Sequence, residues 1–262
     1  MVIFLTMYVI THKKFDYYLP ENYVPLLVGA VSKDKLNGYL SDDKGDNISS
    51  KNKNFCELTG LYWIWKHGQD DIVGLSHYRR YFSGYPLGFL GEVAATLLLG
   101  KLRPISVPRL NKYLEDYDWI LPTPETKFFK KRTVLQQFAA SHGTTSDLET
   151  TRKVLGELYP EYLGDFDKVM NGHQLIICNM FYTRKEYINE YSKWLFTILF
   201  KVEKSIDISN YDEYQSRIYG FLSERLLNVW IEHQQKRFKI KYLNIFNTAE
   251  MNRGFIKKKI FK

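Results

Sequence analysis

The feature that most constrains the fold is a nearly unbroken run of β-branched, aromatic and aliphatic residues at positions 2–10, VIFLTMYVI. A strand that is apolar on both faces is typical of a parallel sheet covered by helices on each side. The run ends in the polar segment THKK at 11–14, and open α/β sheets bind ligands at the carboxyl ends of such strands. These residues therefore predict a fold class and the sheet edge where a site would form.

Strand and helix patterns alternate along the rest of the chain. This alternation predicts an α/β fold, a mostly parallel Rossmann-type sheet flanked by helices, with a helical C-terminal part. No internal repeat or low-complexity linker divides the chain, so we expect one domain at 1–235 and a separate tail at 236–262. Strands are predicted at 23–30, 71–76, 119–121 and 175–182, and helices at 55–67, 87–102, 110–117, 185–204 and 214–235, with helical pieces within 127–170.

The net charge of +8 lies entirely in the last residues. Residues 236–262 hold nine basic residues and one acid, and the segment RGFIKKKIFK at 253–262 interleaves them with apolar side chains. Such a segment suits an anionic membrane surface, at about 1 kcal/mol for each basic residue near the headgroups. An unstructured, solubilising terminus is the alternative. Because residues 1–235 are neutral, they offer no extended basic face, and we expect no nucleic-acid partner.

Other features place the protein in a broad class. The two cysteines, Cys56 and Cys178, lie far apart in apolar stretches, which indicates reduced thiols in the cytoplasm. The run at 2–10 lacks a signal-peptide pattern and is too short to cross a bilayer. The apolar stretch 86–100 is interrupted by glycines and by Glu92. A soluble or peripheral protein is therefore expected.

The most informative site pattern is HYRRYF at 77–82, directly after the strand predicted at 71–76. Each guanidinium of Arg79 and Arg80 is a rigid fork of donors that matches a phosphate group. A pair of surface arginines in ordinary ion pairs is the alternative, but the strand-end position and the flanking aromatic residues favour a site. The common dinucleotide, P-loop, zinc-protease and hydrolase motifs are absent from the sequence.

Several motifs together resemble a known family. They are DNISSKNKNFCELTGLYWIWK at 46–66, GLSHYRRYF at 74–82, YDWILP at 117–122, His142 with Asp147-Leu148, NMF at 179–181, and Arg217 with GFLSERL at 220–226. The chain resembles, over about residues 7–235, bacterial polysaccharide-cluster proteins long described as a domain of unknown function. Members are assigned as glycosyltransferases of capsule, exopolysaccharide and O-antigen synthesis with a GT-A-like fold. The stretch 84–108 and the residues after 235 are less similar to that family.

The resemblance implies a nucleotide-sugar-dependent hexosyltransferase on the inner face of the bacterial membrane. UDP-galactose or UDP-galactofuranose is the expected donor, and a lipid-linked oligosaccharide is the expected acceptor. A non-catalytic carbohydrate-binding or scaffold protein of the polysaccharide assembly machinery remains the alternative.

Enzymes of the GT-A type usually bind a divalent metal through Asp-x-Asp after a strand. Here Asp-x-Asp occurs at Asp116/Asp118 and at Asp165/Asp167, and neither pair follows a predicted strand. Arg79 and Arg80 supply two positive charges for a diphosphate, so we expect transfer without a metal cofactor. If a metal is required, His77 or the acidic cluster Asp42, Asp43 and Asp46 would be the ligand candidates.

The resemblance and the strand-end positions together suggest the donor-binding residues. Several of them also have ordinary interpretations as solvated loop, turn or capping residues. The candidates are Thr11, His12, Lys13, Asp46, Asn47, Lys51, Asn52, His77, Tyr78, Arg79, Arg80, Asn179 and Arg217.

Inverting transfer requires a general base, because the acceptor hydroxyl loses its proton as it attacks. Glu224 is the first candidate, Asp212 the second, and His142, with Asp147 nearby, is a further catalytic candidate. Glu224 lies within a predicted amphipathic helix, so a buried ion pair with Arg217 or Arg225 is an equally good interpretation.

Overall fold

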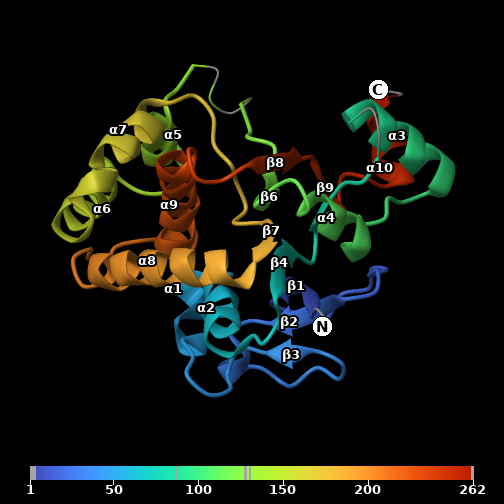
Figure 1. The fold of residues 1–262 in the computed structure, drawn as a ribbon, viewed down its shortest axis with the longest axis horizontal. Helices are drawn as coiled ribbons and strands as arrows, with labels where there is room; N and C mark the ends of the chain where they lie inside the picture. The colour runs from blue at the N-terminus through green and yellow to red at the C-terminus, as the bar shows by residue number, and fades with distance from the viewer. Residues whose placement is uncertain (1–3, 86–87, 127–128, 130, 261–262) are drawn as a thin grey trace.

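The computed structural model describes residues 4–85, 88–126, 129 and 131–260. A sheet crosses the middle of the molecule, with helices α5 to α9 gathered on one side of it (Figure 1). Helices α3 and α10 lie together at the opposite end, beside the C-terminus (Figure 1).

The first half of the sheet is parallel. Strand β1 (Leu5–Thr11) lies between β2 (Tyr23–Leu27) and β4 (Ile72–His77), and β3 (Leu40–Ser41) extends the sheet beyond β2. Residues 7–11 of β1 are all buried, as expected for a strand covered on both faces. The strand predicted at 2–10 is thus confirmed over its described part, while residues 2 and 3 lie outside the described residues.

The second half of the sheet contains antiparallel pairs. Strand β7 (Phe181–Arg184) runs antiparallel between β4 and β6 (Trp119–Pro122), and β8 (Ile240–Leu243) pairs in parallel with β6. The order is β3-β2-β1-β4-β7-β6-β8, and β5 (Arg80–Phe82) branches from β4 to pair with β9 (Ile245–Asn247). The predicted class, a mostly parallel α/β sheet flanked by helices, is confirmed.

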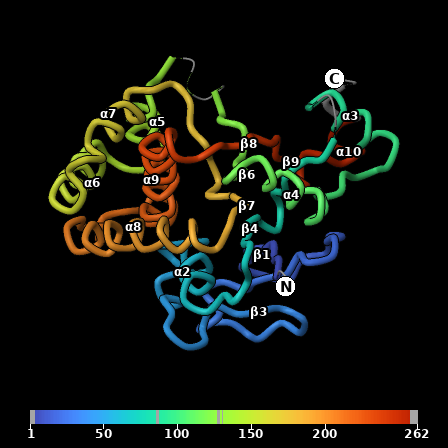
Figure 2. The backbone as a smooth tube through the Cα atoms, viewed as in Figure 1, coloured from blue at the N-terminus to red at the C-terminus, as the bar shows by residue number. Residues whose placement is uncertain are grey.

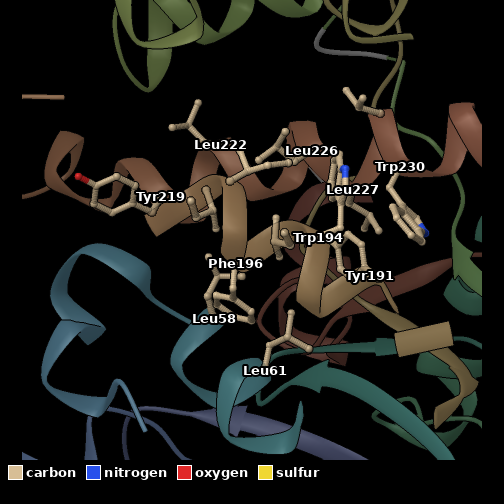
Figure 3. Close-up of a cluster of buried hydrophobic side chains, with 14 of the residues drawn as sticks. Leu58, Leu61, Tyr191, Trp194, Phe196, Tyr219, Leu222, Leu226, Leu227 and Trp230 are labelled. Carbon is tan, nitrogen blue, oxygen red and sulfur yellow. The ribbon is translucent and has the colours of Figure 1, made fainter. Parts of the chain in front are cut away.

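One face of the sheet is covered by α1 (Asn52–Phe55), α2 (Leu58–His67), α8 (Lys185–Glu203) and α9 (Ile218–Gln234). Gly60 allows α2 to approach the sheet closely, because a Cβ there would lie 2.6 Å from Ile10 Cδ1. Figure 3 shows the apolar side chains that join α2, α8 and α9: Leu58, Leu61, Tyr191, Trp194, Phe196, Tyr219, Leu222, Leu226, Leu227 and Trp230.

The predicted helical pieces within 127–170 are α5 (Val134–Ser141), α6 (Thr145–Leu158) and α7 (Leu163–Asn171). Capping boxes begin α5 at Thr133 and α6 at Thr144, which explains where these helices start. Elsewhere, the helices predicted at 87–102 and 110–117 are α3 (Gly88–Leu99) and α4 (Val107–Tyr113), and Leu87 lies outside the described residues.

Two predictions need correction. The strand predicted at 175–182 begins only at Phe181, because Cys178 and Asn179 have φ values of 77° and 46°, which no strand accommodates. The segment 236–262 is not a separate tail, since β8 and β9 belong to the sheet and α10 (Arg253–Ile260) follows them. Figure 2 shows this last segment running from α9 across the sheet to α3. Phe261 and Lys262 lie outside the described residues.

Within the described part of the chain, none of the helices combines the length and the apolar character that crossing a bilayer requires.

Candidate active site

A pocket of about 580 Å³ opens where β1 and β4 end, the edge of the sheet that the sequence predicts for a site. We call it the arginine pocket. Residues from β1, β4, β5, α1, β9 and the turn before α9 contribute to its wall. The lining residues are Ile10, Thr11, His12, Val28, Asn52, Lys53, Cys56, Glu57, His77, Tyr78, Arg79, Arg80, Glu213, Arg217 and Asn247.

Three exposed arginines give this pocket its charge. Arg79, Arg80 and Arg217 take part in none of the ion pairs formed by the described residues. Arg79 lies over the Tyr78 ring, 5.1 Å from its centroid. Burial, together with nearby cationic groups that include Arg79 and Arg217, lowers the pKa of His12. The pocket thus presents guanidinium groups that are available to an anion.

A second pocket of similar volume, about 580 Å³, adjoins the first, and we call it the inner pocket. The two share Glu57, His77, Arg80 and Arg217, so they form one continuous cleft. Further walls come from α5, α9 and the segment before β7. The remaining lining residues are Phe129, Gln137, Ser141, His142, Leu175, Ile177, Cys178, Tyr214, Phe221, Glu224 and Arg225.

The left-handed residues before β7 connect three functional groups. The Cys178 N–H donates to Glu224 Oε1 at 2.8 Å, and His77 Nε2 lies 2.6 Å from the Cys178 carbonyl oxygen. Because a carbonyl oxygen only accepts, His77 carries its proton on Nε2. Burial lowers the pKa of His77 to about 4, so the imidazole is neutral at physiological pH.

Asn179 orients the carboxylate that links the two pockets. Its buried side chain donates to Glu57 Oε1 and to Ser223 Oγ, both at 2.7 Å. Glu57 stands at the start of α2, directly after Cys56, whose φ of 51° breaks the predicted helix. Glu57 Oε1 is therefore fixed by Asn179, and the carboxylate also accepts a hydrogen bond from the backbone N–H of Glu57 itself.

Glu224 is held by Cys178 on one side and by its neighbour on α9, Arg225, on the other. Its Oε2 accepts a 3.0 Å hydrogen bond from Arg225, whose side chain is only 2% exposed. Arg225 also donates to Gln137 Oε1 at 2.6 Å, and the Gln137 amide then donates to His142 Nε2 at 3.1 Å. Burial and the two arginines Arg225 and Arg217 lower the pKa of His142 to about 4.

Burial raises the pKa of both Glu57 and Glu224, because each charged carboxylate loses contact with water. A carboxylate with a raised pKa is a stronger proton acceptor than an exposed one. The cleft therefore combines groups that can hold an anion with groups that can accept a proton.

The structure brings together many of the predicted site residues and leaves others outside. Thr11, His12, Asn52, His77, Tyr78, Arg79, Arg80 and Arg217 line the arginine pocket, and His142 and Glu224 line the inner pocket. Asn179 lies behind Glu57 rather than on the wall.

Five predicted residues lie away from both walls. Asp46 pairs with Lys66 of α2, Asn47 closes a turn to Ser49, and Lys51 pairs with Glu203. Lys13 is exposed beside Tyr78, and Asp212 accepts the N–H of Gln215 before α9.

Several of the acidic groups weighed as metal ligands are engaged elsewhere, whereas Asp43 Oδ1 is buried without a hydrogen-bond partner among the described residues. Asp42 accepts the N–H groups of Gly29 and Ala30, Asp118 accepts that of Lys239, and Asp167 pairs with Arg152. The described residues contain no cluster of three or more His, Cys, Asp or Glu side chains arranged to hold a metal ion.

Glu57 is the principal site residue that the sequence analysis missed. It lies between a cysteine and an apolar helix, a position typical of a helix-capping residue. The available signal was its place in the same motif as Asn52, directly before α2.

Comparisons with known proteins identify a related structure and a family. The apo structure of the bifunctional glycosyltransferase WbbM superposes with a TM-score of 0.83 and 27% sequence identity, over 94% of this chain. The match spans 45% of that structure's length, so the chain corresponds to about half of WbbM. No curated protein matches the sequence. The model of a family described as a domain of unknown function, DUF4422, matches residues 6–235. The chain therefore belongs to the DUF4422 family.

Proposed function

We propose that this chain is a glycosyltransferase that transfers a hexose from a UDP-sugar to a lipid-linked surface-polysaccharide acceptor. The observation that carries the proposal is the cleft, in which three arginines outside any ion pair of the described residues adjoin two carboxylates of raised pKa. The likeness to a bifunctional glycosyltransferase supports the same reaction class.

In this proposal the arginine pocket binds the donor in the manner of a GT-A enzyme. Arg79, Arg80 and Arg217 surround the diphosphate and stabilise the charge that develops on it as the glycosidic bond breaks. His12 and Tyr78, which meet edge to face with their centroids 5.2 Å apart, offer aromatic surface to the nucleoside. The sugar then points toward Glu57, where the two pockets meet.

The acceptor hydroxyl attacks the anomeric carbon from the inner pocket. Its oxygen forms the new C–O bond, its proton passes to a carboxylate, and the bond to the diphosphate breaks to release UDP, with inversion. We assign the proton to Glu57, because Glu57 lines both pockets where donor and acceptor would meet, while both oxygens of Glu224 already accept hydrogen bonds from Cys178 and Arg225. Glu224 then holds Cys178 and Arg225 in place, and remains the second candidate for the base.

The charges of the arginine pocket do not suit a divalent cation. Three guanidinium groups would repel it, and the two carboxylates of raised pKa, Glu57 and Glu224, already accept hydrogen bonds from Asn179, Cys178 and Arg225. We therefore propose that transfer needs no metal cofactor. Activity that disappears in EDTA and returns with manganese would contradict this part of the proposal.

The finer identity of the substrates rests on the family resemblance. UDP-galactose or UDP-galactofuranose is proposed as the donor, and capsule, exopolysaccharide or O-antigen precursors as acceptors. A lipid-linked acceptor implies that the enzyme works as a peripheral protein on the inner face of the bacterial membrane, with the segment 236–262 near the headgroups.

A thermal-shift screen of UDP-, GDP- and dTDP-sugars, with and without manganese, tests the donor assignment. We expect UDP-sugars to raise the melting temperature without added metal, since a ligand stabilises the state that binds it. UDP release with an acceptor extract then separates an enzyme from a binding module. A chain that binds UDP-sugars but releases no UDP with any acceptor would be the carbohydrate-binding or scaffold protein instead.

A further inference from the structure

Helix α3 (Gly88–Leu99) exposes large apolar residues to solvent and buries polar ones. A surface helix of a water-soluble protein usually shows the opposite pattern. Leu90 and Leu98 are 76% and 79% exposed, and Ala94 lies exposed between them at helical spacing. Phe89 and Leu99 are exposed as well. An ordinary surface helix buries such a stripe against the core.

The polar residues of α3 point inward instead. Glu92 is 3% exposed and Thr96 is fully buried, with the Thr96 hydroxyl donating to the Glu92 carbonyl oxygen at 2.8 Å. The carboxylate oxygen Oε1 of Glu92 is buried without a hydrogen-bond partner. Burying a carboxyl group without a full set of hydrogen bonds costs free energy, and exposing leucines to water costs more. The outward face of α3 is therefore adapted to an apolar environment.

Basic residues adjoin α3 in the sequence and in the fold. Lys101 and Arg103 are exposed directly after α3. Arg253, the first residue of α10, is exposed and donates to the carbonyl oxygen of Leu98 at 2.9 Å, which ties the two helices together. Helix α10 places Phe255 on the surface at 41% exposure, and its sequence continues with three lysines, KKK at 257–259. Figure 1 shows α3 and α10 side by side at one end of the molecule.

We propose that α3, with the basic residues around it, is a membrane-docking surface that inserts its leucines among the lipids of an anionic bilayer. An apolar face bordered by cations matches a surface that is apolar inside and negative at its headgroups. With 12 residues, α3 is about 18 Å long, too short to span the bilayer, so it lies in the plane of the interface. This inference deepens the proposed membrane contact, which the sequence alone placed in residues 236–262.

The position of α3 relates the membrane to the cleft. Strand β5 runs from Arg80, which lines both pockets, toward α3, and β9 runs from Ile245 to Asn247 of the arginine pocket before the chain reaches α10. The two strands pair antiparallel, with Arg80 opposite Asn247. Helices α3 and α10 are therefore both connected to the strand pair that forms one wall of the site. Docking would hold the cleft near the headgroups, within reach of a lipid-linked acceptor.

Co-sedimentation of the full chain with vesicles tests the proposal without any sugar donor. The vesicles contain equal parts phosphatidylethanolamine and phosphatidylglycerol, and phosphatidylcholine vesicles serve for comparison. We expect Leu90→Gln/Leu98→Gln to lower the partition coefficient at least about tenfold, since two large apolar side chains no longer enter the lipid. Lys101→Gln/Arg103→Gln should lower binding to the anionic vesicles by about tenfold or more and leave phosphatidylcholine unaffected.

The matched control is Phe4→Gln/Val31→Gln, which removes two apolar side chains that are 62% and 58% exposed away from α3. This variant should bind vesicles as the wild type does, and equal thermal melting of all variants excludes misfolding. Unchanged vesicle binding by Leu90→Gln/Leu98→Gln overturns the proposal. So does a result in which that variant only abolishes self-association, measured by light scattering, because the face would then bind a second copy. A chain that binds vesicles through α3 but transfers no sugar would keep this inference and lose the proposed function.

Discussion

The cleft and helix α3 both reverse the usual distribution of side chains, but in opposite directions. In the cleft, Glu224 and Arg225 are withdrawn from water, yet each is bound by the other and by neighbours on the same chain. On α3, Leu90 and Leu98 face water, and no described residue covers them. The charged groups of the cleft thus bind one another within this chain, whereas the outward leucines of α3 have no apolar partner among the described residues. In the two proposals, stability is given up for chemistry in the cleft and for membrane attachment on α3.

The largest expected effect comes from removing the proposed base. Glu57→Gln keeps the size of the side chain and an oxygen for Asn179, but it cannot take a proton. We expect kcat to fall by about 10²–10⁴ with little change in donor KM. Because burial raises the pKa of Glu57, wild-type activity should decline with falling pH from above the ordinary glutamate range, as the base becomes protonated. Steady-state rates across pH measure both effects.

Glu157→Gln is the control for this prediction, since Glu157 pairs with Lys201 on the surface of α6, away from both pockets. Its rate should equal that of the wild type. If Glu224→Gln loses turnover and Glu57→Gln does not, the base is Glu224. If neither loses turnover, the cleft has no proton-accepting role and the comparison with α3 no longer holds.

Smaller losses are expected from the arginines that face the donor. Arg79→Ala, Arg80→Ala and Arg217→Ala should each reduce kcat/KM at least about tenfold, the scale of one charge-assisted hydrogen bond of about 1.5–3 kcal/mol. The loss should appear with UDP as a weaker Kd too, because the diphosphate remains in that ligand. Calorimetric titration with UDP measures this directly.

Arg152→Ala removes an arginine that pairs with Asp167 on the surface and should change neither kcat/KM nor Kd. Wild-type values in all three pocket variants would remove the diphosphate assignment. They would also leave Arg79, Arg80 and Arg217 without an assigned role.

Much of the fold could be predicted because the chain signals it locally. The buried run of β1 and the periodicity of α8 and α9 require no knowledge of distant residues. The prediction of a strand at 175–182 was wrong, because the apolar sequence gives no sign that Cys178 and Asn179 have left-handed backbone conformations. Distant residues such as Glu57 and Glu224 stabilise these conformations through hydrogen bonds. The strands after residue 235 were missed because alternating basic residues resemble a solvated tail more than a strand.

The site was predictable only where a motif and a strand end coincide. Arg79 and Arg80 follow β4 directly, so their place in the pocket could be inferred from order alone. Glu57 could not, because its importance depends on Asn179, which is 122 positions away. Likewise, the reversed polarity of α3 depends on which face packs on the body, and composition does not reveal this.

The smallest effect is expected on α3, from Glu92→Gln, and it tests whether the buried carboxyl group costs stability. Burial raises the pKa of Glu92, so the folded state holds its proton more tightly than the unfolded chain does. Its stabilising contribution is therefore complete below about pH 4.3, the ordinary glutamate value, and is lost as pH rises through the folded value. Glu92→Gln has no ionisable group at this position, so it does not lose stability in this way as pH rises. Its advantage in free energy of unfolding should consequently grow with pH, as urea titrations at several pH values would measure. Glu161→Gln, on an exposed turn, should show no such trend. If the difference in free energy of unfolding between Glu92→Gln and the wild type does not change with pH either, the buried carboxyl group has no electrostatic cost. That result would weaken the contrast between α3 and the cleft.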